Sequence, residues 1–251
     1  MLRGLRVAVV VPAYRERLLI ARTIRGIPAY VDQIVVVDDA SDDDTSDAAR
    51  SACDPRTTVV RHERNRGVGA AIVSGYQVAF DAGADVAVVM AGDAQMDPAD
   101  LPSLLEPIAS GAADYVKGDR LSFRGVARLM PSLRFVGNHL FSLLTRAATG
   151  LDVRDSQCGY TAISRACAHA LPLESLWPRY GYPNDLLGML AEVDARVVDV
   201  AVRPIYASEI SGIGLRHALF VVPFVLLRVF VRRTTARARP ALLEAGAQRD
   251  R

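Results

Sequence analysis

The stretch Val86–Pro98, VAVVMAGDAQMDP, indicates both how this chain folds and where it binds a ligand. Its first five residues are apolar and predict a buried strand. Oxygen-bearing side chains then follow at alternate positions, Asp93, Gln95 and Asp97. In an open α/β sheet, ligands bind at the carboxyl ends of the strands. Hard oxygen ligands at that edge predict a site for a divalent cation, Mg²⁺ or Mn²⁺.

Apolar runs alternate with helix-like segments on both sides of this stretch. The predicted strands are Leu5–Val11, Gln33–Val37, Thr57–Arg61, Val86–Met90, Ala113–Lys117 and Arg196–Val202, with a further short strand entered from the turn Asp155–Ala162. The later helices are expected at Asp100–Ser110, Leu133–Ala148 and Pro183–Val193. This alternation predicts an α/β fold, a doubly wound and mostly parallel sheet flanked by helices.

Charge is unevenly distributed along the chain. Residues 213–251 contain eight arginines and two acids, a net charge of +6, so the first 212 residues carry −4 of the overall +2. An acidic body argues against nucleic acid as a partner and suits a protein that uses a metal ion. The three cysteines have no metal-ligand spacing and indicate a reducing compartment. A strand pattern begins almost at once, which predicts that no signal peptide is present.

The C-terminal segment has a pattern of its own. Ala218–Leu227 is a run of ten apolar residues, and arginines follow it. A bilayer span needs about 20 apolar residues, so this run is too short. Residues 213–233 are therefore predicted to form an amphipathic helix at a membrane interface, held by apolar burial and by arginine attraction to anionic lipid. A helix packed on the core is the alternative, and 234–251 is expected to be a disordered basic tail.

Four short motifs follow the first four predicted strands. They are PAYRE at 12–16, VDDASDDDT at 37–45, NRGVGAA at 65–71 and GDAQMDP at 92–98. Together they resemble the inverting family 2 glycosyltransferases of the GT-A fold, and most of all their dolichol- or polyprenyl-phosphate sugar synthase branch. The resemblance covers residues 5–212. It implies transfer of a sugar from a UDP- or GDP-sugar to a polyprenyl phosphate or another lipid-linked acceptor, by a cytoplasmic protein attached peripherally to the inner face of the cell membrane.

The resemblance also implies a role for individual residues. The nucleotide would be bound by Pro12, Tyr14, Glu16, Asp38, Asp39, Gly69 and Lys117. The acceptor phosphate would be held by Arg120 and Arg134, and the Mg²⁺ or Mn²⁺ ion by Asp93, Gln95 and Asp97. Residues 1–120 would form the nucleotide-binding half of the GT-A domain, and 121–212 the acceptor half. The turn with Gly67 and Gly69 would let backbone approach the nucleotide.

The metal motif departs from the family pattern at one position. The usual motif is Asp-x-Asp-x-Gln, and this chain has Ala91 where the first Asp belongs. Three explanations stay open. Asp93, Gln95 and waters suffice for a cation that keeps several waters anyway, or Asp97 helps, or catalysis is impaired. The third makes a non-catalytic module that binds a nucleotide-sugar an alternative function.

The acceptor decides whether the reaction needs a base. A lipid phosphate is already an anion and needs none, whereas the hydroxyl of a soluble or saccharide acceptor does. Asp185 is the first candidate for that base and Asp155 the second. The loop 203–214, followed by Arg216, is expected to close over the diphosphate. An NAD-dependent enzyme is disfavoured, because the glycine turn follows the third strand and lacks the third glycine.

Overall fold

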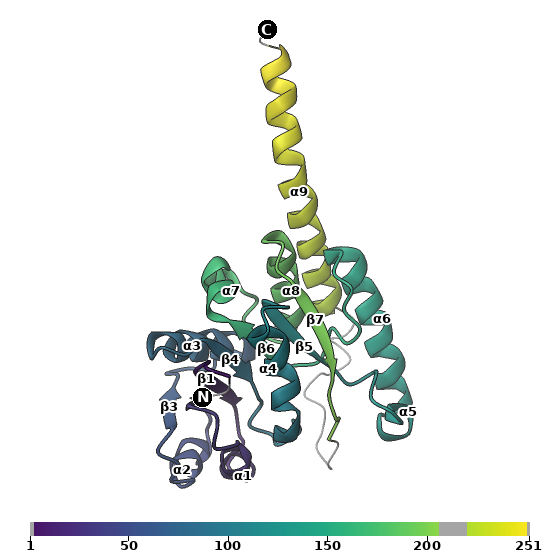
Figure 1. Cartoon of the computed structure of the whole chain (residues 1–251). Coiled ribbons are helices and arrows are strands. Elements are labelled where there is room, and N and C mark those ends of the chain that lie inside the picture. Colours follow the sequence, from purple (N-terminus) through teal and green to yellow (C-terminus); the bar gives the residue numbers. More distant parts are fainter. Residues whose placement is uncertain (1–2, 206–219, 250–251) are drawn as a thin grey trace.

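The computed structural model describes residues 3–205 and 220–249, with side chains as far as residue 235. In this part of the chain one central sheet is flanked by helices, and the last helix extends beyond the body (Figure 1). The strands are β1 (Val7–Ala13), β2 (Gln33–Asp38), β3 (Thr57–Arg61), β4 (Val86–Val89), β5 (Tyr115–Asp119), β6 (Thr161–Ser164) and β7 (Val197–Ala201). The helices are α1 (Ile20–Gly26), α2 (Thr45–Arg50), α3 (Val68–Asp81), α4 (Leu101–Ala109), α5 (Val126–Leu129), α6 (Ser132–Thr149), α7 (Arg165–Ala170), α8 (Tyr182–Glu192) and α9 (Val222–Arg249), with short 3₁₀ turns at Pro98–Asp100 and Leu173–Ser175.

The order of the strands in the sheet is β3-β2-β1-β4-β6-β5-β7. The pairs β1–β2, β1–β4, β2–β3 and β5–β7 are parallel, and β6 runs antiparallel to both of its neighbours, β4 and β5. The predicted α/β fold with a mostly parallel sheet is confirmed. The antiparallel insertion of β6 is a feature that the sequence did not predict.

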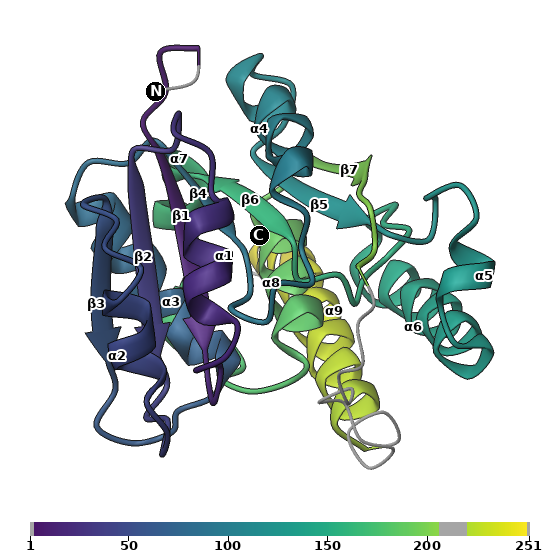
Figure 2. The same ribbon diagram turned by 90° about the horizontal axis from the view of Figure 1, so that it is seen from below.

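Alternate residues of the central strands pack on opposite sides of the sheet. Val9 and Val11 face a layer that contains α1, α2 and α4, whereas Val10 faces α3 and α8. Figure 2 shows α1 and α2 in front of strands β1 and β2, with α3 behind them. A Cβ atom on Gly75 of α3 would lie 2.2 Å from Val10 Cγ1, so this helix requires glycine to approach β1. Burial on both sides explains why these strands are continuous apolar runs.

Helix α9 packs against α6 and α8 at one end of the sheet (Figures 1 and 2). Val222, Leu226 and Val229 form a small core with Ala148 of α6. The backbone stays helical from residue 234 to 249, where the sequence predicted a disordered tail. None of the described helices contains a stretch long and apolar enough to cross a membrane.

Two of the α9 arginines whose side chains the structure describes, Arg228 and Arg232, face acids of α8. Arg228 Nη1 lies 3.6 Å from Asp185 Oδ2, and Arg232 Nη1 lies 3.5 Å from Asp185 Oδ1. Arg232 also pairs with Glu192 of α8 at 2.7 Å. The charges of Arg228 and Arg232 therefore face acids of the same fold. That residues 213–233 form a helix at a membrane interface stays a prediction.

Candidate active site

The first two motifs meet at the carboxyl ends of β1 and β2. The backbone N–H of Arg15 donates to Ser41 Oγ at 3.0 Å, and that of Glu16 donates to Thr45 Oγ1 at 2.8 Å. Arg15 has φ = 60°, a left-handed conformation that costs about 1 kcal/mol for a non-glycine residue. The two hydroxyls hold this turn, so the predicted nucleotide loops form one unit.

Asp38 is fully buried at the end of β2. Its carboxylate accepts hydrogen bonds from the N–H of Ser41 at 2.8 Å and from the Ser46 hydroxyl, and Arg61 Nη1 lies 3.0 Å away. Burial raises the pKa of Asp38, but these hydrogen bonds and the charge of Arg61 more than offset it, so the pKa lies below its ordinary value. Asp38 therefore stabilises the loop from inside, in place of the predicted nucleotide contact.

Asp39 is also engaged within the protein. Its two oxygens accept the backbone N–H groups of Arg66 at 2.8 Å and Gly67 at 2.7 Å. His62 Nδ1 lies 2.7 Å from Asp39 Oδ1. Asp39 is 3% exposed, and its carboxylate joins the second motif to the third. The predicted contact of Asp39 with the base stays a prediction.

The glycines of the third motif serve a contact within the chain. Gly67 has φ = 95°, and a Cβ there would lie 2.4 Å from the carbonyl oxygen of Pro178. A Cβ on Gly69 would lie 2.4 Å from the carbonyl oxygen of Trp177. The backbone that approaches these glycines is therefore that of 177–178, and the predicted approach of Gly69 to the nucleotide is not needed to explain either glycine.

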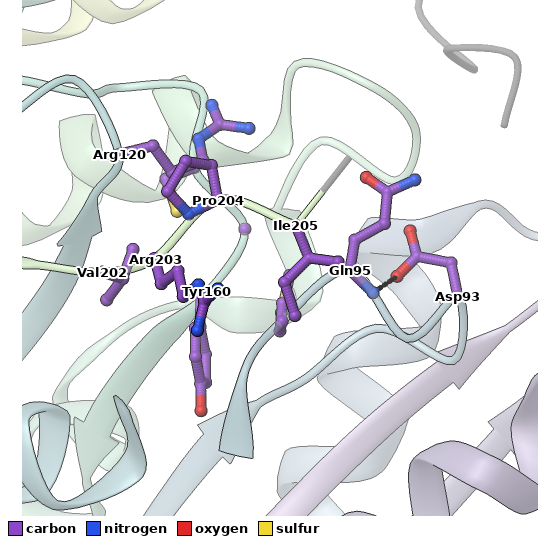
Figure 3. A pocket seen from close by; sticks show the side chains of 11 residues that line it. Asp93, Gln95, Arg120, Tyr160, Val202, Arg203, Pro204 and Ile205 are labelled. Atoms are coloured by element: carbon purple, nitrogen blue, oxygen red, sulfur yellow. Dashed lines mark hydrogen bonds between the residues drawn. The ribbon is translucent and has the colours of Figure 1, made fainter. Parts of the chain in front are cut away.

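Asp93 and Gln95 line an open pocket at the end of β4, and its volume of about 410 Å³ includes open solvent. The backbone between them turns at Ala94, which has φ = 57°. The N–H of Gln95 donates to Asp93 Oδ1 at 3.0 Å, as drawn in Figure 3. Asp97 has a different environment, because its Oδ1 accepts the N–H of Ala99 and caps the 3₁₀ turn. Two of the three predicted metal ligands thus share the pocket, and the third does not line it.

The donor set of the pocket fits a hard divalent cation. In the described part of the chain, no group of three His, Cys, Asp or Glu side chains is arranged to hold a metal. A carboxylate and an amide oxygen nevertheless suit Mg²⁺, which usually takes one or two carboxylates and completes its shell with phosphate oxygens and water. A second carboxylate side chain reaches this loop, because a Cβ on Gly92 would lie 3.5 Å from Glu16 Cγ.

Arg120 lines the same pocket across the segment 202–205 from Gln95 (Figure 3). Its Nε and Nη2 lie 2.7 and 3.0 Å from the two carboxylate oxygens of Asp155, a bidentate pair. Burial raises the pKa of Asp155, but the charges of Arg120 and Lys117 lower it by a larger amount. The pKa of Asp155 therefore lies below its ordinary value. A buried carboxylate with a lowered pKa and a bound guanidinium does not suit a general base, so this geometry argues against the predicted catalytic role of Asp155.

Lys117 lies beneath this pair and does not reach the pocket. Its side chain is fully buried in β5, and its ammonium group donates to the carbonyl oxygen of Cys158. Burial lowers its pKa. Lys117 is therefore a buried cation near Arg120 and Asp155, and this conformation shows no route from it to a nucleotide in the pocket.

Asp185, the other predicted base, is fully buried on α8. Its Oδ2 accepts the N–H of Trp177 at 2.8 Å, and the two α9 arginines described above face it. A carboxylate without exposed surface between two arginines cannot take a proton from an acceptor hydroxyl in this conformation. The candidate base is thus part of the α8–α9 contact.

The remaining predictions fall at the edge of the pocket. Arg134 lies in the first turn of α6, half-buried, and is not among the residues that line the pocket. The start of the predicted closing loop, Arg203 to Ile205, does line it. Residues 206–214 and Arg216 lie outside the described residues.

Part of the pocket wall was not predicted from the sequence. Cys158, Gly159 and Tyr160 precede β6 and line the pocket, and the Tyr160 hydroxyl donates to the carbonyl oxygen of Asp97 at 2.9 Å. The only sequence signal there is the turn DSQCGY before a short strand. Because β6 is antiparallel, the start of this strand, and not its end, reaches the site.

Comparisons with known proteins agree with this geometry. The family model described as Glycosyl transferase family 2 matches residues 8–171. The UDP-N-acetylglucosamine–dolichyl-phosphate N-acetylglucosaminyltransferase of Methanococcus voltae is 28% identical over 78% of this chain and 84% of its own. The undecaprenyl-phosphate mannosyltransferase of Micrococcus luteus is 32% identical over 83% of this chain and 88% of its own.

A solved structure shows the same fold. The glucosyl-3-phosphoglycerate synthase of Mycobacterium tuberculosis, in complex with Mn²⁺, uridine diphosphate and glucosyl-3-phosphoglycerate, superposes with a TM-score of 0.67 and 26% identity. The match covers 90% of this chain and 80% of that one. The two relatives are named for lipid-linked phosphates, which confirms the branch that the motifs predicted. This chain therefore belongs to glycosyl transferase family 2, and it is a hexosyltransferase of that family.

Proposed function

We propose that this protein transfers a hexose from a UDP- or GDP-sugar to a polyprenyl phosphate, with inversion, while attached peripherally to the inner face of the membrane. The observation that carries the proposal is the pocket itself, which joins the oxygen donors Asp93 and Gln95 to the fixed cation Arg120. Both candidate bases, Asp155 and Asp185, form ion pairs with arginines. An acceptor that is already an anion needs no base, so this arrangement favours a phosphate over a hydroxyl.

The donor would lie along the edge formed by the first motifs. Pro12, Tyr14 and Glu16 would contact the nucleoside, on the loop that Ser41 and Thr45 hold in place. Asp93 and Gln95 would hold Mg²⁺ or Mn²⁺ on the diphosphate. When bound, the cation would neutralise the negative charge of the leaving group, the nucleoside diphosphate.

The acceptor would enter from the side of Arg120. Arg120, Arg134 and Arg203 would hold its phosphate, and Asp155 keeps the guanidinium of Arg120 in a fixed orientation. One phosphate oxygen forms a bond to the anomeric carbon as the bond from that carbon to the diphosphate breaks. No proton moves in this step, because the nucleophile and the leaving group are both anions.

The test is transfer by the full chain from UDP- and GDP-sugars to a short, water-soluble polyprenyl phosphate, with Mg²⁺ or Mn²⁺ and with a chelator. Asp93→Asn should lower kcat by about 10²-fold or more, as expected when a charge-stabilising group is lost. Asp97→Asn is the matched control, because asparagine also caps a turn and should leave the rate within a few-fold. Full turnover in chelator, or equal effects of the two variants, would contradict the proposal.

A soluble acceptor is the second candidate. The Mycobacterium tuberculosis structure holds glucosyl-3-phosphoglycerate, a soluble product, on the same fold. Faster turnover of a soluble hydroxyl acceptor than of polyprenyl phosphate would favour this candidate. Metal-dependent binding of nucleotide without turnover of either acceptor would favour a non-catalytic module, which Ala91 motivates.

A further inference from the structure

Helix α6 is amphipathic, but its polar face points into the protein and its apolar face points outward. Its polar face is turned into the protein, where Asn138, Ser142, Thr145 and Thr149 are at most 7% exposed. Its apolar face is turned outward, with side chains between 41 and 84% exposed. These residues, the α6 apolar stripe, are Leu133, Val136, Leu140, Leu143 and Leu144. A helix of a water-surrounded protein has the opposite arrangement, so the stripe needs an apolar environment that the described part of the chain does not supply.

Hydrogen bonds on the polar face fix this orientation. Thr145 Oγ1 accepts a hydrogen bond from Asn184 Nδ2 at 2.6 Å, and Ser142 Oγ accepts the N–H of Ser156 at 3.0 Å. Turning the helix to bury its leucines would leave these groups unsatisfied, at about 1–3 kcal/mol for each. The outward stripe is therefore a property of the folded state.

The neighbouring helices also carry exposed apolar side chains. Leu129 of α5, directly before α6, is half exposed. On α9, which packs beside α6, Phe224, Leu227 and Phe230 are each about half exposed, while Val222 and Val229 face the body. Figure 2 shows α5 and α6 at the right of the molecule, with α9 nearer its centre.

The charge around the stripe indicates what covers it. Residues 121–151 contain four arginines and no Asp or Glu. Arg124 and Arg128 are exposed in the segment before α6, and Arg134 lies next to the first residue of the stripe. An isologous dimer through this surface would bring these like charges together. A surface of apolar side chains bordered by arginines complements an anionic bilayer, where the apolar residues enter the headgroup boundary and the arginines meet the lipid phosphates.

We infer that the α6 apolar stripe, bordered by Arg124 and Arg128, is a lipid-docking surface for an anionic bilayer, separate from the C-terminal helix. The inference rests on the proposed function in one respect: a bilayer bound here presents lipid phosphates to Arg134, at the same end of α6. The occupant is the membrane surface itself, and the polyprenyl phosphate is reached from it.

Sedimentation of the full chain with vesicles tests this directly. Vesicles of phosphatidylcholine with phosphatidylglycerol should bind the protein, and pure phosphatidylcholine should bind it at least tenfold more weakly. The double variant Leu140→Gln with Leu143→Gln should lose at least tenfold in affinity for the mixed vesicles. A second pair, Leu133→Gln with Val136→Gln, should do the same. The matched control is Leu18→Gln, an 82% exposed leucine before α1, which should bind like the wild type.

The arginines have a separate readout. Arg124→Gln with Arg128→Gln should reduce the preference for anionic vesicles several-fold, and added salt should weaken binding of the wild type more than that of this variant. Turnover of a short, water-soluble polyprenyl phosphate should stay unchanged in all these variants. If the wild type binds vesicles but transfers no sugar to this acceptor, the result contradicts the proposed function and leaves the docking surface standing.

Two results would overturn the inference. One is vesicle binding that both stripe variants retain in full. The other is a dimer of the wild type in light scattering that the stripe variants dissolve, because the stripe would then be covered by a second copy of the chain.

Discussion

At the scale of single residues, Ala91 is the position where this chain departs from its family. Ala91 is partly exposed beside the pocket, and its N–H donates to Met96 Sδ at 3.3 Å. Ala91→Asp should add a carboxylate next to the proposed cation and tighten Mn²⁺-dependent binding of UDP or GDP by about tenfold, near 1.4 kcal/mol. Titration calorimetry measures this, with Ala91→Asn as the uncharged control. Equal affinity in the wild type and both variants would mean that the position does not face the cation.

Asp199 of β7 gives a pH dependence of stability. Burial raises its pKa to about 6, against the attraction of Lys117, and its Oδ1 has no hydrogen-bond partner in the described structure. Because the folded state holds this proton more tightly than the unfolded state, stability should fall as pH rises from about 4 to about 6. Asparagine at this position does not titrate, so the Asp199→Asn variant should keep its stability as pH rises. Its Tm should rise relative to that of the wild type by a few degrees between about pH 4 and about pH 6. Urea or thermal unfolding at several pH values checks this, and a constant difference at every pH would contradict it.

The sequence could place residues together where they are close in the chain. Asp93 and Gln95 share a pocket because a strand end and one tight turn determine their positions. The ion pairs of Asp155 and Asp185 could not be predicted, because their partners, Arg120 and Arg232, are distant in the sequence. A spacing pattern shows that an acid is present at a helix start, but it does not show which cation the fold brings to it.

At the scale of elements, the close contact of α8 and α9 makes a sharp prediction. A Cβ on Gly188 would lie 2.7 Å from both methyl groups of Val229, a β-branched side chain that cannot turn away easily. Gly188→Ala should therefore destabilise the protein by about 1–3 kcal/mol. Gly137→Ala on α6 is the matched control, since no atom lies within 4 Å of its Cβ position, and it should stabilise by about 0.5–1 kcal/mol. Urea unfolding of both variants measures the difference, and equal effects would mean that α9 yields at this contact.

Periodicity predicted most elements but not how they face. The spacing of apolar residues located helix α6 within two residues of its observed ends, Ser132 and Thr149. The same spacing is compatible with an apolar face turned inward or outward, and only the partners of Ser142 and Thr145 decide between them. The direction of a strand is equally hard to predict, because the four-residue pattern of β6 is the same for a parallel and an antiparallel strand.

At the scale of the whole molecule, ligand binding should stabilise the fold measurably. If the first motifs and the metal site bind one ligand together, then UDP or GDP with Mn²⁺ at one hundred times its Kd adds about 2.7 kcal/mol to the free energy of unfolding. For a chain of this size, that corresponds to a rise in Tm of about 5–10 °C. Thermal unfolding with nucleotide in Mn²⁺ or in chelator is the measurement. An equal rise in chelator would show that the nucleotide binds without the cation.

The antiparallel strand β6 also has a consequence for how the chain is made. Strand β4 pairs with β1 on one side and with β6 on the other, and β5 pairs only with β6 and β7. While the ribosome is still synthesising the residues before Thr161, the nascent chain therefore has an apolar strand with an unpaired edge, a known route to aggregation. The first 120 residues contain the nucleotide loops, but they are not expected to fold as a stable unit before β6 has been synthesised.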